Sequence, residues 1–131
     1  MRDFLSFHTV LVAQLFYVVL GAGYNLVSLA RRARGRPSLA PTDPRTGLAF
    51  MAALILPIAA GWAGFTLAFA VLWAILGPLL LLLGVLPHAQ ALLAGGDALD
   101  GYASRTSCQL ALAINLSGLL TVVAGLLLVF L

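Results

Sequence analysis

The chain contains 131 residues, of which 63% are hydrophobic and only 8% are charged. About a quarter of the residues in a soluble globular domain are charged, so this composition excludes a water-soluble fold and indicates a protein embedded in lipid. The net charge of +3 arises from seven Arg and four Asp, and five of the arginines fall in one connecting segment. The basic charge is therefore local, and it does not predict nucleic-acid binding.

Three uncharged stretches dominate the chain, at residues 4–30, 46–86 and 109–131. A helix needs roughly 20 residues to cross the hydrocarbon core of a bilayer, and each stretch is at least that long. Transmembrane β-strands instead need alternating apolar and polar residues, and no such alternation is present. We therefore predict an all-α fold, an integral membrane helical bundle that forms a single transmembrane domain over residues 1–131.

The first predicted span, residues 4–30, is followed by a basic loop over residues 31–45 that also contains three prolines. Positively charged loops remain on the cytoplasmic side, so we expect this loop to face the cytoplasm and the N-terminus to lie outside. Positive charge follows the apolar run instead of preceding it, which predicts a retained helix and not a cleaved signal peptide. The residues that set the orientation are Arg31, Arg32, Arg34, Arg36 and Arg45.

Residues 46–86 would be about 60 Å long as one helix, which is twice the thickness of the hydrocarbon core. Gly61–Thr66, near the middle, contains two glycines that favour a turn and two aromatic residues of the kind found at membrane interfaces. This pattern favours a hairpin with spans at residues 46–62 and 66–86. The alternative is one long kinked helix, with three spans in all.

A Gly-rich loop over residues 87–108 and a last span at residues 109–131 complete the predicted topology. In the four-span arrangement the C-terminus also lies outside. Arginine without lysine, against a background of Leu, Ala and Gly, is typical of a GC-rich bacterial gene, so we expect the membrane to be the bacterial cytoplasmic membrane.

Polar and small residues recur at helical spacing in the first and last spans. Helices in lipid associate through close approach at small residues and through interhelical hydrogen bonds, so we interpret these stripes as packing faces. Pore lining, or contact with a pigment or quinone, is the alternative. The packing candidates are Gln14, Tyr17, Gly21, Tyr24, Asn25, Asn115, Gly118 and Gly125.

In the third span a small face at Ala70, Ala74 and Gly77 is expected to pack on the bundle. Leu80 is expected to face lipid.

The segment Asp97–Arg105, with the sequence DALDGYASR, resembles the first half of the CDP-alcohol phosphotransferase signature, D-x-x-D-G-x-x-A-R, with Ser104 in place of the alanine. The resemblance implies that the two aspartates bind a divalent metal ion and that two further aspartates on the next helix complete the metal site. The positions that correspond to those two further aspartates hold Ser117 and Thr121 instead. We therefore interpret the segment as a polar turn.

His8 and His88 are the two possible axial ligands for a haem or chlorophyll. In the four-span arrangement they lie near opposite faces of the membrane, so they cannot bind one metal ion in a single chain. We expect both to pack at the interface, and we predict no cofactor, no metal site and no catalytic residue.

The functional hypothesis from the sequence is therefore a non-enzymatic accessory or scaffold subunit. Its partners would be the lipid bilayer and either a larger membrane complex or copies of itself. Mid-membrane ionisable residues mark ion-coupled transport, and the spans contain none. An oligomeric channel or facilitator for a small solute is the alternative, because polar uncharged groups can line a pore. A degenerate lipid-processing enzyme is a third possibility.

We predict that labelling of single cysteines, or reporter fusions, will place residues 31–45 inside and both termini outside. Replacing the four arginines from Arg31 to Arg36 should scramble the orientation, because these residues carry most of the positive bias. A C-terminus on the cytoplasmic side would contradict the four-span topology.

Overall fold

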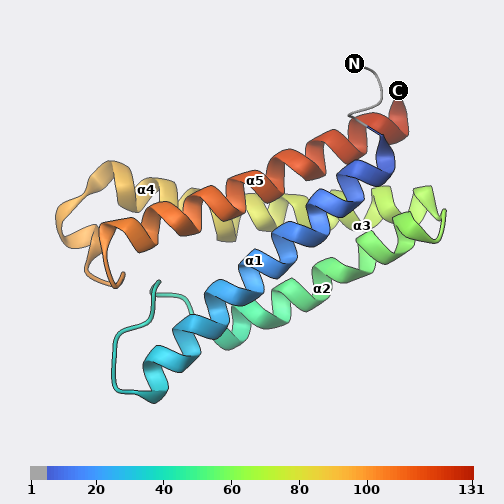
Figure 1. Ribbon diagram of the computed structural model, residues 1–131. Helices are drawn as coiled ribbons and strands as arrows, with labels where there is room; N and C mark the ends of the chain where they lie inside the picture. The colour runs from blue at the N-terminus through green and yellow to red at the C-terminus, as the bar shows by residue number, and fades with distance from the viewer. Residues whose placement is uncertain (1–5) are drawn as a thin grey trace.

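Four helices that are long and apolar enough to cross a membrane make up most of the computed structural model, which describes residues 6–131 (Figure 1). Within the third of these, a short π-helical segment, η2, separates two α-helical parts. The elements in chain order are α1 (Phe7–Ala33), α2 (Pro44–Trp62), α3 (Thr66–Leu79), η2 (Leu80–Val85), α4 (Leu86–Ala94), the 3₁₀ turn η3 (Gly96–Leu99) and α5 (Arg105–Phe130). The protein is thus a multi-pass membrane protein with an all-α fold.

The chain reverses direction between α2 and α3. The Phe65 amide donates to the Ala60 carbonyl (2.9 Å) and the Gly64 amide donates to the Gly61 carbonyl (3.1 Å). Gly64 has φ +82°, which a residue with a Cβ rarely adopts. The prediction of four helices is confirmed, and one long kinked helix over this region is wrong.

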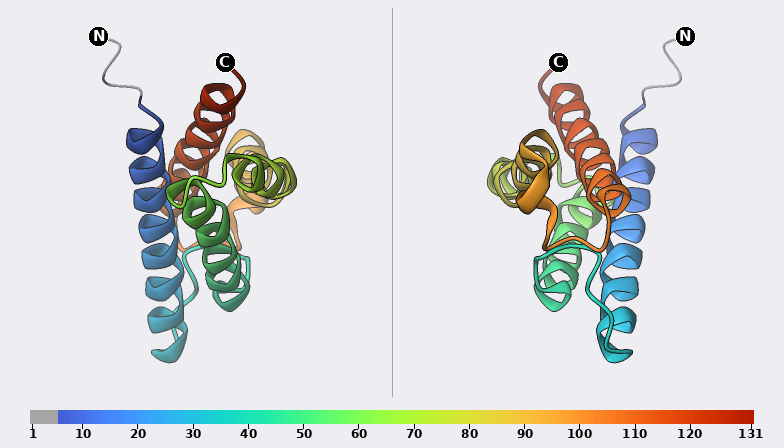
Figure 2. Two further views of the ribbon diagram at one scale, coloured as in Figure 1. Left: turned by 90° about the vertical axis from the view of Figure 1, so that its right-hand side faces the viewer. Right: turned by 90° about the vertical axis from the view of Figure 1, so that its left-hand side faces the viewer.

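The helices run back and forth, so that the segments 34–43 and 95–104 lie at one end of the bundle (Figures 1 and 2). We call this the loop end. The α2–α3 turn, the N-terminal end of α1 and the C-terminal end of α5 lie at the opposite end. Helix α1 packs on α2 and α5, and α5 also packs on η2 and α4. Helix α2 packs on α3 near the turn but has no comparable packing on η2 or α4.

The third span is longer than predicted. It does not end at Leu86 but continues through α4 to Ala94, so the predicted loop over residues 87–108 is reduced to 95–104. Pro87 cannot donate a backbone hydrogen bond, and a proline ordinarily ends or kinks a helix for that reason. Here it lies in the first turn of α4, directly after η2, where the wider i→i+5 bonding of a π-helix accommodates the missing donor.

The other helix ends also extend into the predicted loops. Arg31 and Arg32 lie in the last turn of α1, where cations interact favourably with the helix dipole. Asp43 caps the first turn of α2 by accepting from the Arg45 amide, and Ser104 and Ser107 form a capping box at the start of α5. The described part of the first span begins at Ser6, so Phe4 and Leu5 lie outside the described residues.

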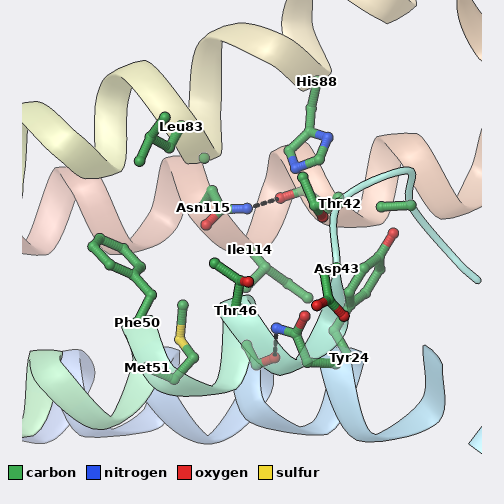
Figure 3. Close-up of a pocket in the computed structure, with 16 residues that line it drawn as sticks. Tyr24, Thr42, Asp43, Thr46, Phe50, Met51, Leu83, His88, Ile114 and Asn115 are labelled. Carbon is green, nitrogen blue, oxygen red and sulfur yellow. Dashed lines mark hydrogen bonds between the residues drawn. The ribbon is translucent and has the colours of Figure 1, made fainter. Parts of the chain in front are cut away.

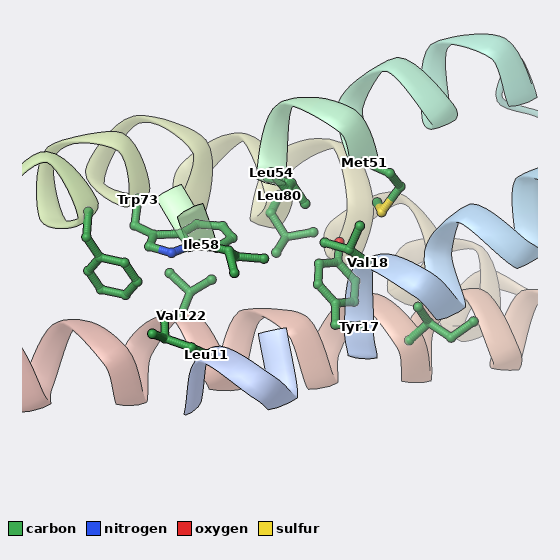
Figure 4. Close-up of a cluster of buried hydrophobic side chains, with 11 residues drawn as sticks. Leu11, Tyr17, Val18, Met51, Leu54, Ile58, Trp73, Leu80 and Val122 are labelled. Atoms are coloured by element: carbon green, nitrogen blue, oxygen red, sulfur yellow. The ribbon is translucent and has the colours of Figure 1, made fainter. Parts of the chain in front are cut away.

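Large side chains fill the middle of the bundle (Figure 4). Two expectations for the third span are wrong here, because Ala74 is exposed and Leu80 is completely buried. The helix packs through Phe69, Trp73 and Leu80, which follow the helical repeat on one face. Ala70 and Gly77, the other two residues of the predicted small face, are buried beside these large side chains. The buried cluster consists of Leu11, Tyr17, Val18, Met51, Leu54, Ile58, Phe69, Trp73, Leu80, Ile114 and Val122.

We predict that Leu80→Ala lowers the free energy of unfolding by about 2–5 kcal/mol, because it leaves a cavity in the core. Leu82→Ala is the matched control, since the side chain of Leu82 is 56% exposed. Thermal unfolding of the purified variants in detergent measures both. Equal midpoints for the two variants would contradict the packing described here.

Candidate functional site

Helices α1 and α5 pack closely at Gly118. A Cβ atom at this position would lie 2.7 Å from the ring of Tyr17, so only glycine leaves room for the ring. The Tyr17 hydroxyl donates to Asn115 Oδ1 (3.2 Å), and Asn115 Nδ2 donates to the Ala111 carbonyl (2.9 Å). The predicted stripes of the first and last helices therefore lie against each other.

About one turn from Tyr17 toward the N-terminus of α1, Gln14 makes another polar contact between α1 and α5. It is fully buried, and its Nε2 donates to the Thr121 carbonyl (3.2 Å). A Cβ atom at Gly125 would lie 3.2 Å from this nitrogen. Gly21 instead approaches Met51 on α2. The small and polar residues thus pack within the chain itself.

The two connecting segments are bonded to each other at the loop end. The Leu39 carbonyl accepts from the Ser107 hydroxyl (2.8 Å) and the Ala103 amide (3.3 Å), and the Leu39 amide donates to Ser28 Oγ (3.2 Å). Tyr24 Oη donates to the Ser107 carbonyl (2.9 Å). Segment 34–43 is therefore tied to α1, to α5 and to segment 95–104, and it has a fixed conformation.

The arginines of the predicted basic loop differ in their contacts. Arg31 Nε donates to the Pro37 carbonyl (2.8 Å), Arg32 Nε donates to Ser38 Oγ (2.6 Å), and Arg32 forms an ion pair with Asp43 (3.3 Å). Arg31 and Arg32 hold the segment. Arg34, Arg36, Arg45 and Arg105 are exposed at the loop end together with Asp97 and Asp100, so positive charge is in excess on this surface.

A cavity of about 290 Å³ lies behind segment 34–43, between α2 on one side and η2 and α4 on the other (Figure 3). It exists because α2 packs on α1 while η2 packs on α5, and little joins α2 to η2. Its lining is mainly apolar with a few polar groups, as in most small-molecule sites. The residues around it are Gly21, Tyr24, Asn25, Ala40, Thr42, Asp43, Thr46, Gly47, Phe50, Met51, Leu83, Gly84, His88, Ala111, Ile114 and Asn115.

His88 extends from α4 into this cavity (Figure 3). The prediction that His88 lies in a loop is wrong, because it lies on a helix and only 5% of it is exposed. Its Nδ1 is 2.7 Å from the Tyr102 hydroxyl. Burial raises the pKa of Tyr102 above its ordinary value, so this hydroxyl stays protonated and orients the imidazole. His8 lies at the far end of α1.

The Asp97–Arg105 segment forms η3 and the turn that leads into α5. Asp97 and Asp100 are exposed. Within residues 6–131, no group of three or more His, Cys, Asp or Glu side chains is placed to hold a metal ion. The sequence predicted no role for Tyr102. In the structure its hydroxyl contacts His88, the histidine at the cavity.

Comparison with protein-family models, with curated proteins and with solved structures found no match to this chain.

Several residues that line the cavity were predicted from the sequence, but as helix-packing residues. Tyr24, Asn25, Gly21 and Asn115 were predicted as packing residues, and they line the cavity as well. Thr46, Gly47, Phe50 and Gly84 were missed. Two of these could have been predicted, because Gly47 and Gly84 lie inside helices. A glycine destabilises a helix interior, so its presence there often indicates that a neighbouring side chain approaches closely.

We predict that Tyr102→Phe lowers the free energy of unfolding by about 1–3 kcal/mol, because His88 Nδ1 loses its partner in a buried position. Thermal unfolding measures the effect. In a double-mutant cycle with His88→Leu, the two changes should be less than additive. Additive effects would show that the two side chains do not interact.

Proposed function

We propose that this integral membrane protein is a non-enzymatic accessory subunit of a larger membrane complex. The observation that supports the proposal best is the fixed, basic surface of the loop end. Connecting segments that carry no function are usually mobile and variable. Segment 34–43 is instead held by hydrogen bonds to Ser28, Ser107 and Ala103.

The charge on this surface indicates what it would contact. Arg34, Arg36, Arg45 and Arg105 are exposed on it, and they outnumber the exposed Asp97 and Asp100. Asp43 is already paired with Arg32. A preformed basic surface favours an acidic surface on the partner, because complementary charge accelerates association and fixes its register. By the positive-inside rule this contact would form on the cytoplasmic side of a bacterial inner membrane, with the N-terminus outside.

The rest of the exterior is suited to helix contacts within the bilayer. Large aliphatic and aromatic side chains are exposed on every span, for example Phe16, Leu56, Ile75 and Leu120. The small and polar residues of α1 and α5 are occupied by contacts inside the chain. In this proposal the bundle is a rigid unit that presents its loop end to the partner, and its lateral faces meet lipid or partner helices.

Photo-crosslinking tests the proposal. A photoreactive amino acid at Arg36, on the loop end, should form a defined adduct with a larger membrane protein in cells. The same amino acid at Phe65, on the exposed α2–α3 turn at the opposite end, should not form that adduct. The purified protein should also migrate with the larger assembly in mild detergent. Migration as a free monomer, with no adduct from either position, would contradict the proposal.

Reconstitution separates this proposal from the channel alternative. The isolated chain in liposomes should pass small solutes no faster than empty vesicles, since Gln14 and Asn115 are engaged in α1–α5 contacts. A selective flux that is lost on replacing Gln14 or Asn115 would favour a channel.

A further inference from the structure

We propose that the cavity between α2 and η2–α4 binds the headgroup of an uncharged, membrane-dissolved amphiphile whose polar part carries hydrogen-bond-accepting oxygens, such as an isoprenoid quinone or an acylglycerol. This inference goes beyond the accessory role and does not depend on it. It stands on the shape of the cavity, on the order of its lining residues and on His88.

The two ends of the cavity differ in polarity, and the Asn115 amide lies between them (Figure 3). Thr42, Asp43 and His88 lie toward the loop end, and Phe50 and Leu83 lie toward the middle of the bundle. This order matches the bilayer itself, in which polarity falls from the interface to the hydrocarbon core. A molecule that enters with its headgroup toward the loop end keeps its tail at the depth that suits it.

A histidine nitrogen is available at the polar end. His88 is nearly completely buried, and its Nδ1 is engaged by Tyr102. Among residues 6–131, no hydrogen bond is made by its other nitrogen, Nε2. When the Tyr102 hydroxyl donates to Nδ1, the neutral imidazole carries its proton on Nε2 and becomes a donor. A carbonyl or ester oxygen is the complement of such a donor.

Two glycines keep the cavity open by giving room to two amide side chains. A Cβ atom at Gly84 would lie 2.8 Å from Asn115 Oδ1, and one at Gly47 would overlap the amide of Asn25. Asn115 and Asn25 each use Nδ2 to donate to a backbone carbonyl of their own helix, at 2.9 Å and 2.8 Å. Each amide nitrogen has a second hydrogen, so α1 and α5 can each supply a further donor to the cavity.

The ligand is inferred to be uncharged because the carboxylate at the cavity is already neutralised. Asp43 forms an ion pair with Arg32 and accepts from the Arg45 amide. An ion brought into the apolar part would lose its hydration without a partner. The volume of about 290 Å³ is near the lower limit for small-molecule sites, so it suits a headgroup whose tail lies outside.

The tail has a route into the bilayer. The side chain of Leu83 borders the cavity at its apolar end and is 61% exposed. Helix α2 has little packing on η2 there. A tail can therefore leave the cavity sideways between these two helices.

Native mass spectrometry of the full chain in detergent tests the inference, with decylubiquinone and dioctanoylglycerol titrated separately. At least one should bind saturably with one molecule per chain, and the probe that binds identifies the source of the headgroup. Leu83→Trp blocks the apolar opening and should weaken binding at least tenfold. Leu82→Trp is the matched control, because Leu82 is similarly exposed but does not line the cavity, and it should leave binding unchanged.

His88→Leu provides a second variant, which should weaken binding about tenfold through loss of one hydrogen bond. Its elution profile and helical circular dichroism establish that it is folded. Three results would overturn the inference: no saturable binding of either probe, equal weakening by Leu82→Trp and Leu83→Trp, or stronger binding of the anionic lipid dioleoylphosphatidylglycerol than of both probes.

Discussion

The structure depends on one constraint, that a polar side chain surrounded by hydrocarbon is costly unless it finds a partner within the protein. Tyr17 shows how the chain meets it. The ring fits against α5 only because residue 118 is glycine, and the approach brings the hydroxyl within 3.2 Å of Asn115. Gln14 repeats the arrangement with one of its two polar atoms: Nε2 donates to the Thr121 carbonyl near Gly125, whereas Oε1 is buried without a hydrogen-bond partner among the described residues. These contacts set the crossing of α1 and α5, on which the other helices are placed.

The remaining helices attach to this pair in a matching way. Asn25 on α1 approaches α2 at Gly47, and Asn115 on α5 approaches η2 at Gly84. Each contact places an Asn side-chain amide against a glycine. The first joins α2 to α1, and the second joins η2 to α5. Because α2 has little packing on η2 or α4 beyond the α2–α3 turn, α2 and η2 separate toward the loop end. The cavity is the space that results, and segment 34–43 lies across its polar end.

The sequence predicted the features that follow from local chemistry. Apolar length and the glycines near Trp62 were sufficient to predict four helices, and the Gly64 turn lies inside the predicted segment. It did not predict α4, because Pro87 normally ends a helix and nothing local indicated the π-helical segment that precedes it. The burial of His88 was missed for the same reason.

The faces of the third span were predicted less well than those of α1 and α5. In α1 and α5 the polar groups mark the inner face, since they must be satisfied there. The third span contains no such marker between Thr66 and Leu86, and large apolar side chains are acceptable both in the core and in lipid. Trp73 and Leu80 are buried because they fill the space left by the other helices, which depends on the whole fold.

The central claim is that the chain folds back so that its two connecting segments meet at one end, in front of the cavity. Disulfide formation between Pro41→Cys and Gly101→Cys, in a Cys108→Ser background, tests it most directly, because a Cβ atom on Gly101 would touch Pro41. The account predicts rapid crosslinking within one chain upon mild oxidation, and none between position 41 and Gly64→Cys at the opposite end. Failure of the 41–101 pair to form, or labelling of these two positions from opposite sides of the membrane, would contradict it.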